Sequence, residues 1–248
     1  MIQNPFANLT PVVKNLLIIN VIFFIATYIL GEQAHILDME KWLGAHYFGA
    51  PTFRLWQIIS YMFMHGGLWH ILFNMIGLVS FGPILEQTMG EKRFFIFYFI
   101  CGIGALLCQM TVQAIEVHAA IGQFTVPGVT LANVELRDGS SPFLAYDLPI
   151  AQKLYGIYNF PLVGASGAIF GILVAFGMFY PNLELMVMPI PVPIKAKFLI
   201  PIYIVFELVM GFGQFAGDSV AHFAHLGGAL VGFIVIKAWG IHRSNNFF

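Results

Sequence analysis

Six long apolar stretches occupy most of this 248-residue chain and leave it few ways to fold. They cover roughly residues 12–30, 67–86, 93–115, 163–180, 197–213 and 221–240. A helix needs about 20 mostly apolar residues to cross the hydrocarbon core of a bilayer. Only 9% of the residues are charged, whereas soluble domains carry about 25%. We therefore expect an all-α membrane protein, a bundle of six transmembrane helices that forms a single domain over residues 1–248.

The charged residues indicate orientation and exclude one class of partner. The net charge is −1 and no basic stripe is present, so nucleic-acid binding is not expected. If the N-terminus lies inside, more basic residues fall on the cytoplasmic side than outside, which predicts cytoplasmic termini at both ends. We expect a multi-pass protein of a bacterial plasma membrane. The inner set is Lys14, Lys92, Arg93, Lys195, Lys197, Lys237 and Arg243, and the outer set is Lys41, Arg54, Arg137 and Lys153.

Two long external segments join the apolar stretches. Residues 31–66 are rich in aromatic side chains, which suit the membrane–water interface, so we expect short interfacial helices there. Residues 116–162 contain four prolines. We expect an irregular external loop, with a strand pair in Val126–Val134 as the alternative. Because this loop carries no candidate catalytic group except His118, we expect it to be dispensable for chemistry and to tune substrate access.

Ser166 opens the fourth apolar stretch within the sequence Gly164-Ala165-Ser166-Gly167. The first-turn N–H groups of a helix have no intrahelical partner, and a helix N-terminus stabilises developing negative charge. A nucleophilic serine could use both properties. The alternative is a small residue that only helps helices to pack.

His225 shares one helix face with Gly228 and Gly232 in the last apolar stretch. Glycines at such spacing allow close helix contact. The fourth stretch offers a matching stripe of Gly164, Gly167 and Gly171. Packing of the two stripes would bring His225 near Ser166. The alternatives are a packing motif with an incidental histidine, or His222 in place of His225.

His65, His70 and Asn74 stand at the start of the second apolar stretch. His70 and Asn74 are four residues apart and share a helix face. Both side chains can donate hydrogen bonds, as an oxyanion site requires. The alternative is hydrogen bonding between helices, with His65 fixing the first external segment.

Together these motifs resemble the rhomboid family of intramembrane serine proteases. The resemblance rests on HxxxxHxxxN at 65–74, GxSG at 164–167 and AHxxG at 224–228, in the order of the family. It implies that Ser166 is the nucleophile and His225 its general base. It also implies an oxyanion site made by His70, Asn74 and the Ser166 N–H group, with Gly164 and His65 in support and Phe170 stacked on the histidine.

The resemblance further implies that the partners are membrane-anchored protein substrates in the lipid bilayer. The sequence departs from the family pattern at Trp56-Gln57, where the resemblance implies a Trp-Arg motif. Which contacts anchor the first external segment is therefore left open. The segment 116–162 is also longer than in bacterial members.

No carboxylate stands at an obvious position to orient His225, so a Ser-His dyad is favoured over a triad. We interpret Asp218 as a solvated or capping residue and expect Glu86 to form structural hydrogen bonds inside the bundle. Glu207 is a further carboxylate at membrane depth.

Two other classes of protein are alternatives. One is an inactive family member that binds clients, and the other is a metal carrier that uses the four histidines His65, His70, His222 and His225. Because no cysteine or carboxylate ligand is expected nearby, we predict no metal and no cofactor.

Overall fold

The computed structural model describes residues 9–33, 36–136, 139–187, 190–213 and 221–240, which are mostly helical. Within these ranges five helical stretches are long and apolar enough to cross a membrane. They are Pro11–Gly31, which contains α1 (Pro11–Thr27) and part of the π-helical turn η1 (Tyr28–Gln33), and then α4 (Leu68–Met89), α5 (Glu91–Ile121), α8 (Ala196–Gly213) and α9 (His222–Trp239). A further apolar helix, α7 (Ser166–Phe179), is shorter. The chain is therefore a helical integral membrane protein, as the apolar stretches predict.

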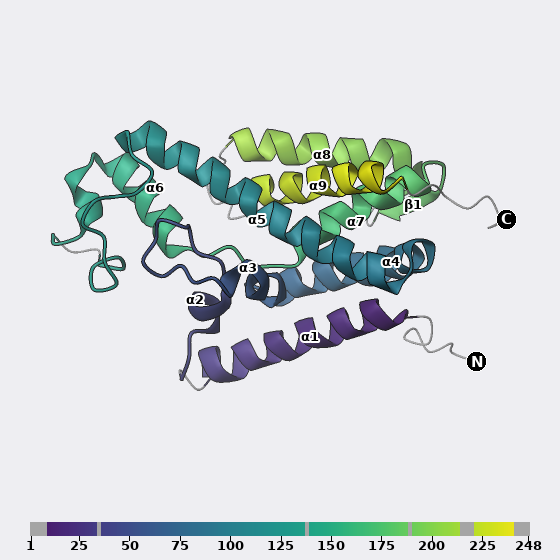
Figure 1. The fold of residues 1–248 in the computed structure, drawn as a ribbon, viewed down its shortest axis with the longest axis horizontal. Coiled ribbons are helices and arrows are strands. Elements are labelled where there is room, and N and C mark those ends of the chain that lie inside the picture. The colour runs from purple at the N-terminus through teal and green to yellow at the C-terminus, as the bar shows by residue number, and fades with distance from the viewer. Residues whose placement is uncertain (1–8, 34–35, 137–138, 188–189, 214–220, 241–248) are drawn as a thin grey trace.

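The outward faces of these helices are apolar. Along α8 the outer side chains are more than half exposed: Phe198, Ile202, Val205, Val209 and Phe212. Such a surface needs lipid around it rather than water. Figure 1 shows that the start of α1 and the end of α9 lie at one end of the bundle, while α6 (Leu148–Asn159) lies beyond the opposite end.

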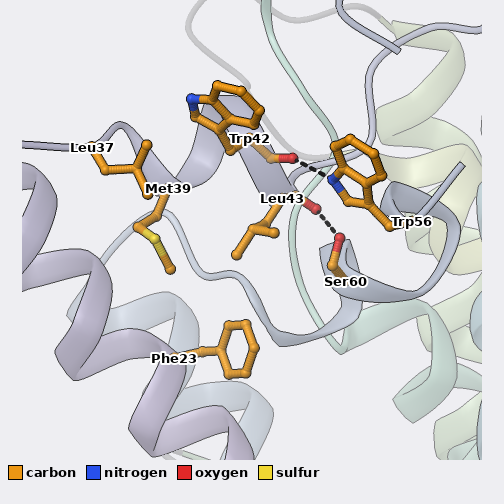
Figure 2. A pocket seen from close by; sticks show the side chains of 7 residues that line it. All are labelled: Phe23, Leu37, Met39, Trp42, Leu43, Trp56 and Ser60. Carbon is orange, nitrogen blue, oxygen red and sulfur yellow. Dashed lines mark hydrogen bonds between the residues drawn. The ribbon is translucent and has the colours of Figure 1, made fainter. Parts of the chain in front are cut away.

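The first external segment contains α2 (Met39–Leu43), α3 (Gln57–Ser60) and the 3₁₀ turn η2 (Tyr61–Phe63), so the predicted short helices are present. An apolar cavity of about 580 Å³ lies between this segment and α1. Figure 2 shows two hydrogen bonds at its wall, from Trp56 Nε1 to the Trp42 carbonyl oxygen (3.0 Å) and from Ser60 Oγ to the Leu43 carbonyl oxygen (2.7 Å). The lining residues are Phe23, Leu37, Met39, Trp42, Leu43, Trp56 and Ser60.

The second external segment differs from the expected irregular loop. Helix α5 continues to Ile121, the turn η3 (Pro142–Ala145) follows, and then α6 begins with Pro149 in its first turn. The alternative of a strand pair in Val126–Val134 is wrong, because that stretch consists of turns. A second hydrophobic core forms here and includes Tyr47 and Ala50 of the first segment: Tyr47, Ala50, Val117, Val126, Val134, Phe143, Ala151, Leu154, Ile157 and Tyr158.

A hydrogen bond and an ion pair tie the two external segments together. Tyr47 Oη of the first segment donates to the Phe124 carbonyl oxygen of the second (2.7 Å). Within the second segment, the Val126 N–H donates to Tyr158 Oη (2.8 Å). Lys41 pairs with Glu135. We call residues 36–66 together with the described part of 116–162 the external cap.

At the other end of the bundle, α7 and α8 are joined by an antiparallel strand pair, β1 (Glu184–Val187) and β2 (Ile190–Lys195). Glu184 is paired with Lys195 in this hairpin. Proline is tolerated here because both strands are edges of a two-stranded sheet. The sequence patterns do not predict these strands.

Candidate active site

Ser166 is the first residue of α7, and Gly164 shapes the backbone before it. Gly164 has a φ of +122°, a conformation that side-chain-bearing residues rarely adopt. Its N–H donates to the Tyr61 carbonyl oxygen (2.9 Å), which ties the start of α7 to the first external segment. A Cβ atom at position 164 would lie 2.7 Å from His70 Nε2. Glycine at this position therefore permits both the turn and the approach of His70.

The short length of α7 sets the depth of Ser166. Fourteen residues form a helix about 21 Å long, which is shorter than the hydrocarbon core of about 30 Å. The far end of α7 leads into the hairpin that carries Glu184 and Lys195, and charged side chains mark the edge of the apolar layer. We therefore expect Ser166, at the other end, to lie inside the apolar layer.

Ser166 and His225 are hydrogen-bonded, with 2.8 Å between Ser166 Oγ and His225 Nε2. The two glycine stripes produce this approach, since Gly228 packs on the backbone of Gly167, and Gly232 packs on the backbone of Gly171. A Cβ atom at 232 would stand 2.7 Å from the Gly171 Cα. The expected contact between the stripes is therefore present, although Gly164 lies against His70 instead of α9.

An aromatic stack holds the plane of the His225 ring. The Phe170 ring lies 4.3 Å from it, centroid to centroid, with an angle of 9° between the planes. Tyr203 of α8 also stacks with Phe170, with the centroids 5.4 Å apart and 7° between the planes. Phe170 thus stands where the sequence motifs place a ring, and Tyr203 is an addition that they did not indicate.

His70 and Asn74 lie on α4 beside the start of α7. His70 Nδ1 faces the Gly66 N–H at 3.4 Å, and its Nε2 faces Gly164. Asn74 is buried and its Nδ2 donates to the His70 carbonyl oxygen (2.9 Å), a bond within the helix. The His70 ring therefore reaches the edge of the serine site, whereas the Asn74 amide is engaged along α4.

His65 lies just before α4 and packs its ring edge against His70, with the centroids 5.1 Å apart. Burial, together with the neighbouring His70, lowers the pKa of His65 to about 3. The His65 imidazole is therefore neutral at physiological pH and serves as packing for His70.

Glu207 of α8 belongs to this site, and the sequence motifs do not indicate it. Its Oε2 lies 3.0 Å from His225 Nδ1 and 2.6 Å from His222 Nδ1. The expectation that no carboxylate lies near these histidines is wrong. A signal was available, because a carboxylate inside a membrane-spanning helix is costly and marks a functional position by default. Asp218 lies outside the described residues.

The three side chains also have the composition of a metal site. The candidate ligand atoms of Glu207, His222 and His225 all lie within 4.8 Å of one another. Glu207 Oε2 nevertheless lies at hydrogen-bond distance from both Nδ1 atoms, 2.6 Å from that of His222 and 3.0 Å from that of His225, and His225 Nε2 is directed at Ser166.

Glu86 has a structural role. It accepts hydrogen bonds from the Thr10 hydroxyl (2.5 Å) and from the N–H groups of Val12 (3.0 Å) and Val13 (2.9 Å), so it caps α1, in line with the bonds expected for it.

Gln57 anchors the first external segment. Its Oε1 accepts a hydrogen bond from the Arg54 N–H (3.0 Å), and its Nε2 donates to the Thr52 carbonyl oxygen (3.2 Å). The anchoring left open by the missing arginine is thus supplied by an amide.

Known proteins are similar to this chain over most of its length. The family model described as the rhomboid domain matches residues 52–242, which include each residue discussed at the serine site. Rhomboid-like protease 3 of Toxoplasma gondii is 31% identical over 97 residues, 38% of this chain and 37% of the relative. The mitochondrial rhomboid protein 1 of Saccharomyces cerevisiae is 26% identical over 193 residues, 76% and 42% of the two chains.

A bacterial relative, rhomboid protease GluP of Bacillus subtilis, is 26% identical over 196 residues, 77% of this chain and 27% of the relative. The matched part thus covers about two fifths or less of the length of these three relatives.

Proposed function

Since the chain belongs to the rhomboid family, we propose that it is an intramembrane serine endopeptidase that cleaves membrane-anchored proteins within or near their transmembrane segments. The observation that carries the proposal is the 2.8 Å hydrogen bond between Ser166 Oγ and His225 Nε2 at the start of α7. The names of relatives such as rhomboid protease GluP support it.

In the proposed reaction Ser166 attacks the carbonyl carbon of the scissile peptide bond. His225 Nε2 accepts the hydroxyl proton, which makes the oxygen nucleophilic, and then delivers that proton to the leaving amine. An acyl-enzyme remains on Ser166. Water then releases the acyl group, with His225 again acting as base.

The oxyanion of each tetrahedral intermediate is assigned to the start of α7. The Ser166 N–H is a first-turn donor at the positive end of the helix. His70 supplies a second donor from Nε2, which faces Gly164, and Asn74 lies one turn further along α4. Because Asn74 Nδ2 donates to His70 in the absence of substrate, its role requires a rotation of the amide when substrate binds.

The proposed substrates follow from where the serine lies. A peptide bond can reach Ser166 only from a segment that is itself in the apolar layer, which means a transmembrane segment. There a helical carbonyl is engaged in the i to i−4 ladder, so the scissile bond must lie where the helix opens. We assign both termini to the cytoplasmic side of the membrane, because of the distribution of basic residues.

The direct test is cleavage of a transmembrane substrate by the protein reconstituted in liposomes. Ser166→Ala should abolish cleavage and also covalent labelling by a fluorophosphonate, which reacts with an activated serine. A family member that only binds clients would show neither cleavage nor labelling in the native form. The Gly156→Ala variant in α6 is a matched control, since a Cβ atom there has nothing closer than 3.9 Å.

A further inference from the structure

We propose that Glu207 is a positioning residue, which fixes the ring of His225 for its work on Ser166, and that His222 holds the Glu207 carboxylate in place. This inference rests on the proposed function. It extends that function from a Ser-His dyad to a Ser-His-Glu arrangement with a second histidine on the same carboxylate. The three side chains come from two helices: α8 gives Glu207, and α9 gives both histidines.

The burial of Glu207 requires an explanation. Its exposed fraction is 4%, on a helix whose outer face is apolar. A carboxylate inside the membrane is expensive unless it is paired and hydrogen-bonded. Its described side-chain partners are the imidazoles of His222 and His225, and both contacts go to one oxygen atom, Oε2.

The carboxylate decides which nitrogen of His225 carries a proton. A neutral imidazole has one N–H donor and one acceptor nitrogen, and an ionised carboxylate can only accept. Nδ1 of His225 must therefore hold the proton that Glu207 accepts, which leaves Nε2 free to take the proton of Ser166. The stack on Phe170 fixes the plane of the ring but does not distinguish these two tautomers.

The carboxylate also balances the charge that forms during the reaction. When the proton moves from Ser166 Oγ to His225 Nε2, the ring becomes an imidazolium ion whose Nδ1 lies 3.0 Å from Glu207 Oε2. Opposite charges at such a distance attract strongly in an apolar surrounding. The proton on Nδ1 stays there, and Glu207 itself takes up no proton in this scheme.

His222 restrains the carboxylate from the second side. Its Nδ1 lies 2.6 Å from Oε2, and the His222 and His225 rings stand nearly perpendicular, at 85°. Tyr203, one turn before Glu207 on α8, adds its ring to the Phe170 stack. Helix α8 thus contacts the His225 assembly both through its carboxylate and through an aromatic ring.

The test compares Glu207→Gln, Glu207→Ala and Glu207→Asp by cleavage kinetics in liposomes. Gln keeps an acceptor but removes the charge, so we expect kcat to fall by about 10–10²-fold, the value of a hydrogen bond to a charged group, with KM nearly unchanged. Ala also removes the acceptor and should cost about tenfold more. Asp restores the charge on a shorter side chain and should recover part of the loss. His222→Ala should lower kcat by about tenfold, since one hydrogen bond to the carboxylate is lost.

A second measurement does not depend on activity. In protein labelled with ¹⁵N-histidine, the ring nitrogens of His225 should show a protonated Nδ1 in the native form and a shift towards the other tautomer in Glu207→Ala. Glu86→Gln is the matched control, because Glu86 is also a buried carboxylate but it caps α1. That variant should lower the unfolding temperature and leave the kcat of the folded protein unchanged.

Several outcomes would overturn the inference. If Glu207→Gln and Glu207→Ala keep the native kcat while Ser166→Ala is inactive, the positioning role is refuted and the proposed function stands. If Ser166→Ala still cleaves, the proposed function itself fails. Loss of activity in EDTA that Zn²⁺ restores would show that a metal, and not protons, joins the three side chains. An unchanged His225 tautomer in Glu207→Ala would refute the inference even if that variant is too unstable for kinetics.

Discussion

Gly228 of α9 packs directly on the backbone of Gly167 of α7, so closely that a methyl group at position 228 would overlap the Gly167 carbonyl oxygen. Gly167 follows Ser166 in the chain, and Gly228 lies three residues after His225. The contact between these glycines therefore sets the distance between the serine and the histidine.

The first prediction is that Gly228→Ala separates α7 from α9. The added methyl group meets backbone, which cannot move aside as a flexible side chain can, so overpacking should cost about 1–3 kcal/mol of stability. Cleavage should fall strongly even in the folded protein. Thermal unfolding in detergent and cleavage in liposomes measure the two effects. Gly156→Ala should show neither effect, and native activity in Gly228→Ala would contradict the prediction.

The second prediction concerns the proposed nucleophile and base. Ser166→Ala and His225→Ala should each lose nearly all cleavage. Because the two side chains act as one unit, the double variant should be hardly slower than either single one. Rates of substrate cleavage for the three variants measure this. Multiplicative losses would mean that the two residues act independently.

The third prediction concerns the proposed oxyanion donors. Losing one such donor costs about 10²–10³ in rate in a soluble serine protease. His70→Ala and Asn74→Ala should therefore weaken cleavage strongly while leaving a measurable trace, which the Ser166 and His225 variants do not. Single-turnover rates on the same substrate provide the comparison. Native rates in Asn74→Ala would remove Asn74 from the oxyanion site and confine it to its bond along α4.

The fourth prediction separates the external cap from the chemistry. Tyr158 is fully buried in the second core and accepts the hydrogen bond of the Val126 N–H. Tyr158→Ala should destabilise the protein by about 3–5 kcal/mol, as for other large aromatic side chains. Fluorophosphonate labelling of Ser166 in the protein that remains folded should be unchanged. Loss of labelling without loss of folded protein would show that the cap shapes the active site.

The fifth prediction is the orientation in the membrane. Single cysteines at positions 140 and 244, in a background without Cys101 and Cys108, should react with impermeant maleimides from opposite sides. Position 140 should be labelled from outside and position 244 from the cytoplasm, because of the distribution of basic residues. Labelling of both from the same side would refute this topology.

The approach of His225 to Ser166 could be predicted because it depends on a local pattern. Glycines three and four residues apart lie on one helix face, and two such faces tend to pack closely. The spacing of the glycines is therefore enough to predict this contact. The position of Glu207 could not be predicted in this way. Helix α8 is apolar around most of its circumference, so its sequence does not tell which face meets the bundle and which meets lipid.

The structure of the external cap does not follow from its sequence for a related reason. Its prolines favour irregular structure, yet Pro149 stands in the first turn of α6, where the missing N–H is not needed. The apolar side chains of α6 pack with Tyr47, which comes about a hundred residues earlier in the chain. Pairing over such a separation leaves no local pattern in either segment.

The burial of α7 has a consequence for the supply of water. Most of its fourteen residues are buried against neighbouring helices, and α4 and α5 beside it have 22 and 31 residues, enough to cross a hydrocarbon core of about 30 Å. The short helix is thus surrounded by protein rather than by lipid. Water for the second half of the proposed reaction must then reach Ser166 between side chains of this protein, so the acyl-chain length of the surrounding lipids should have little effect on turnover while the bundle stays folded.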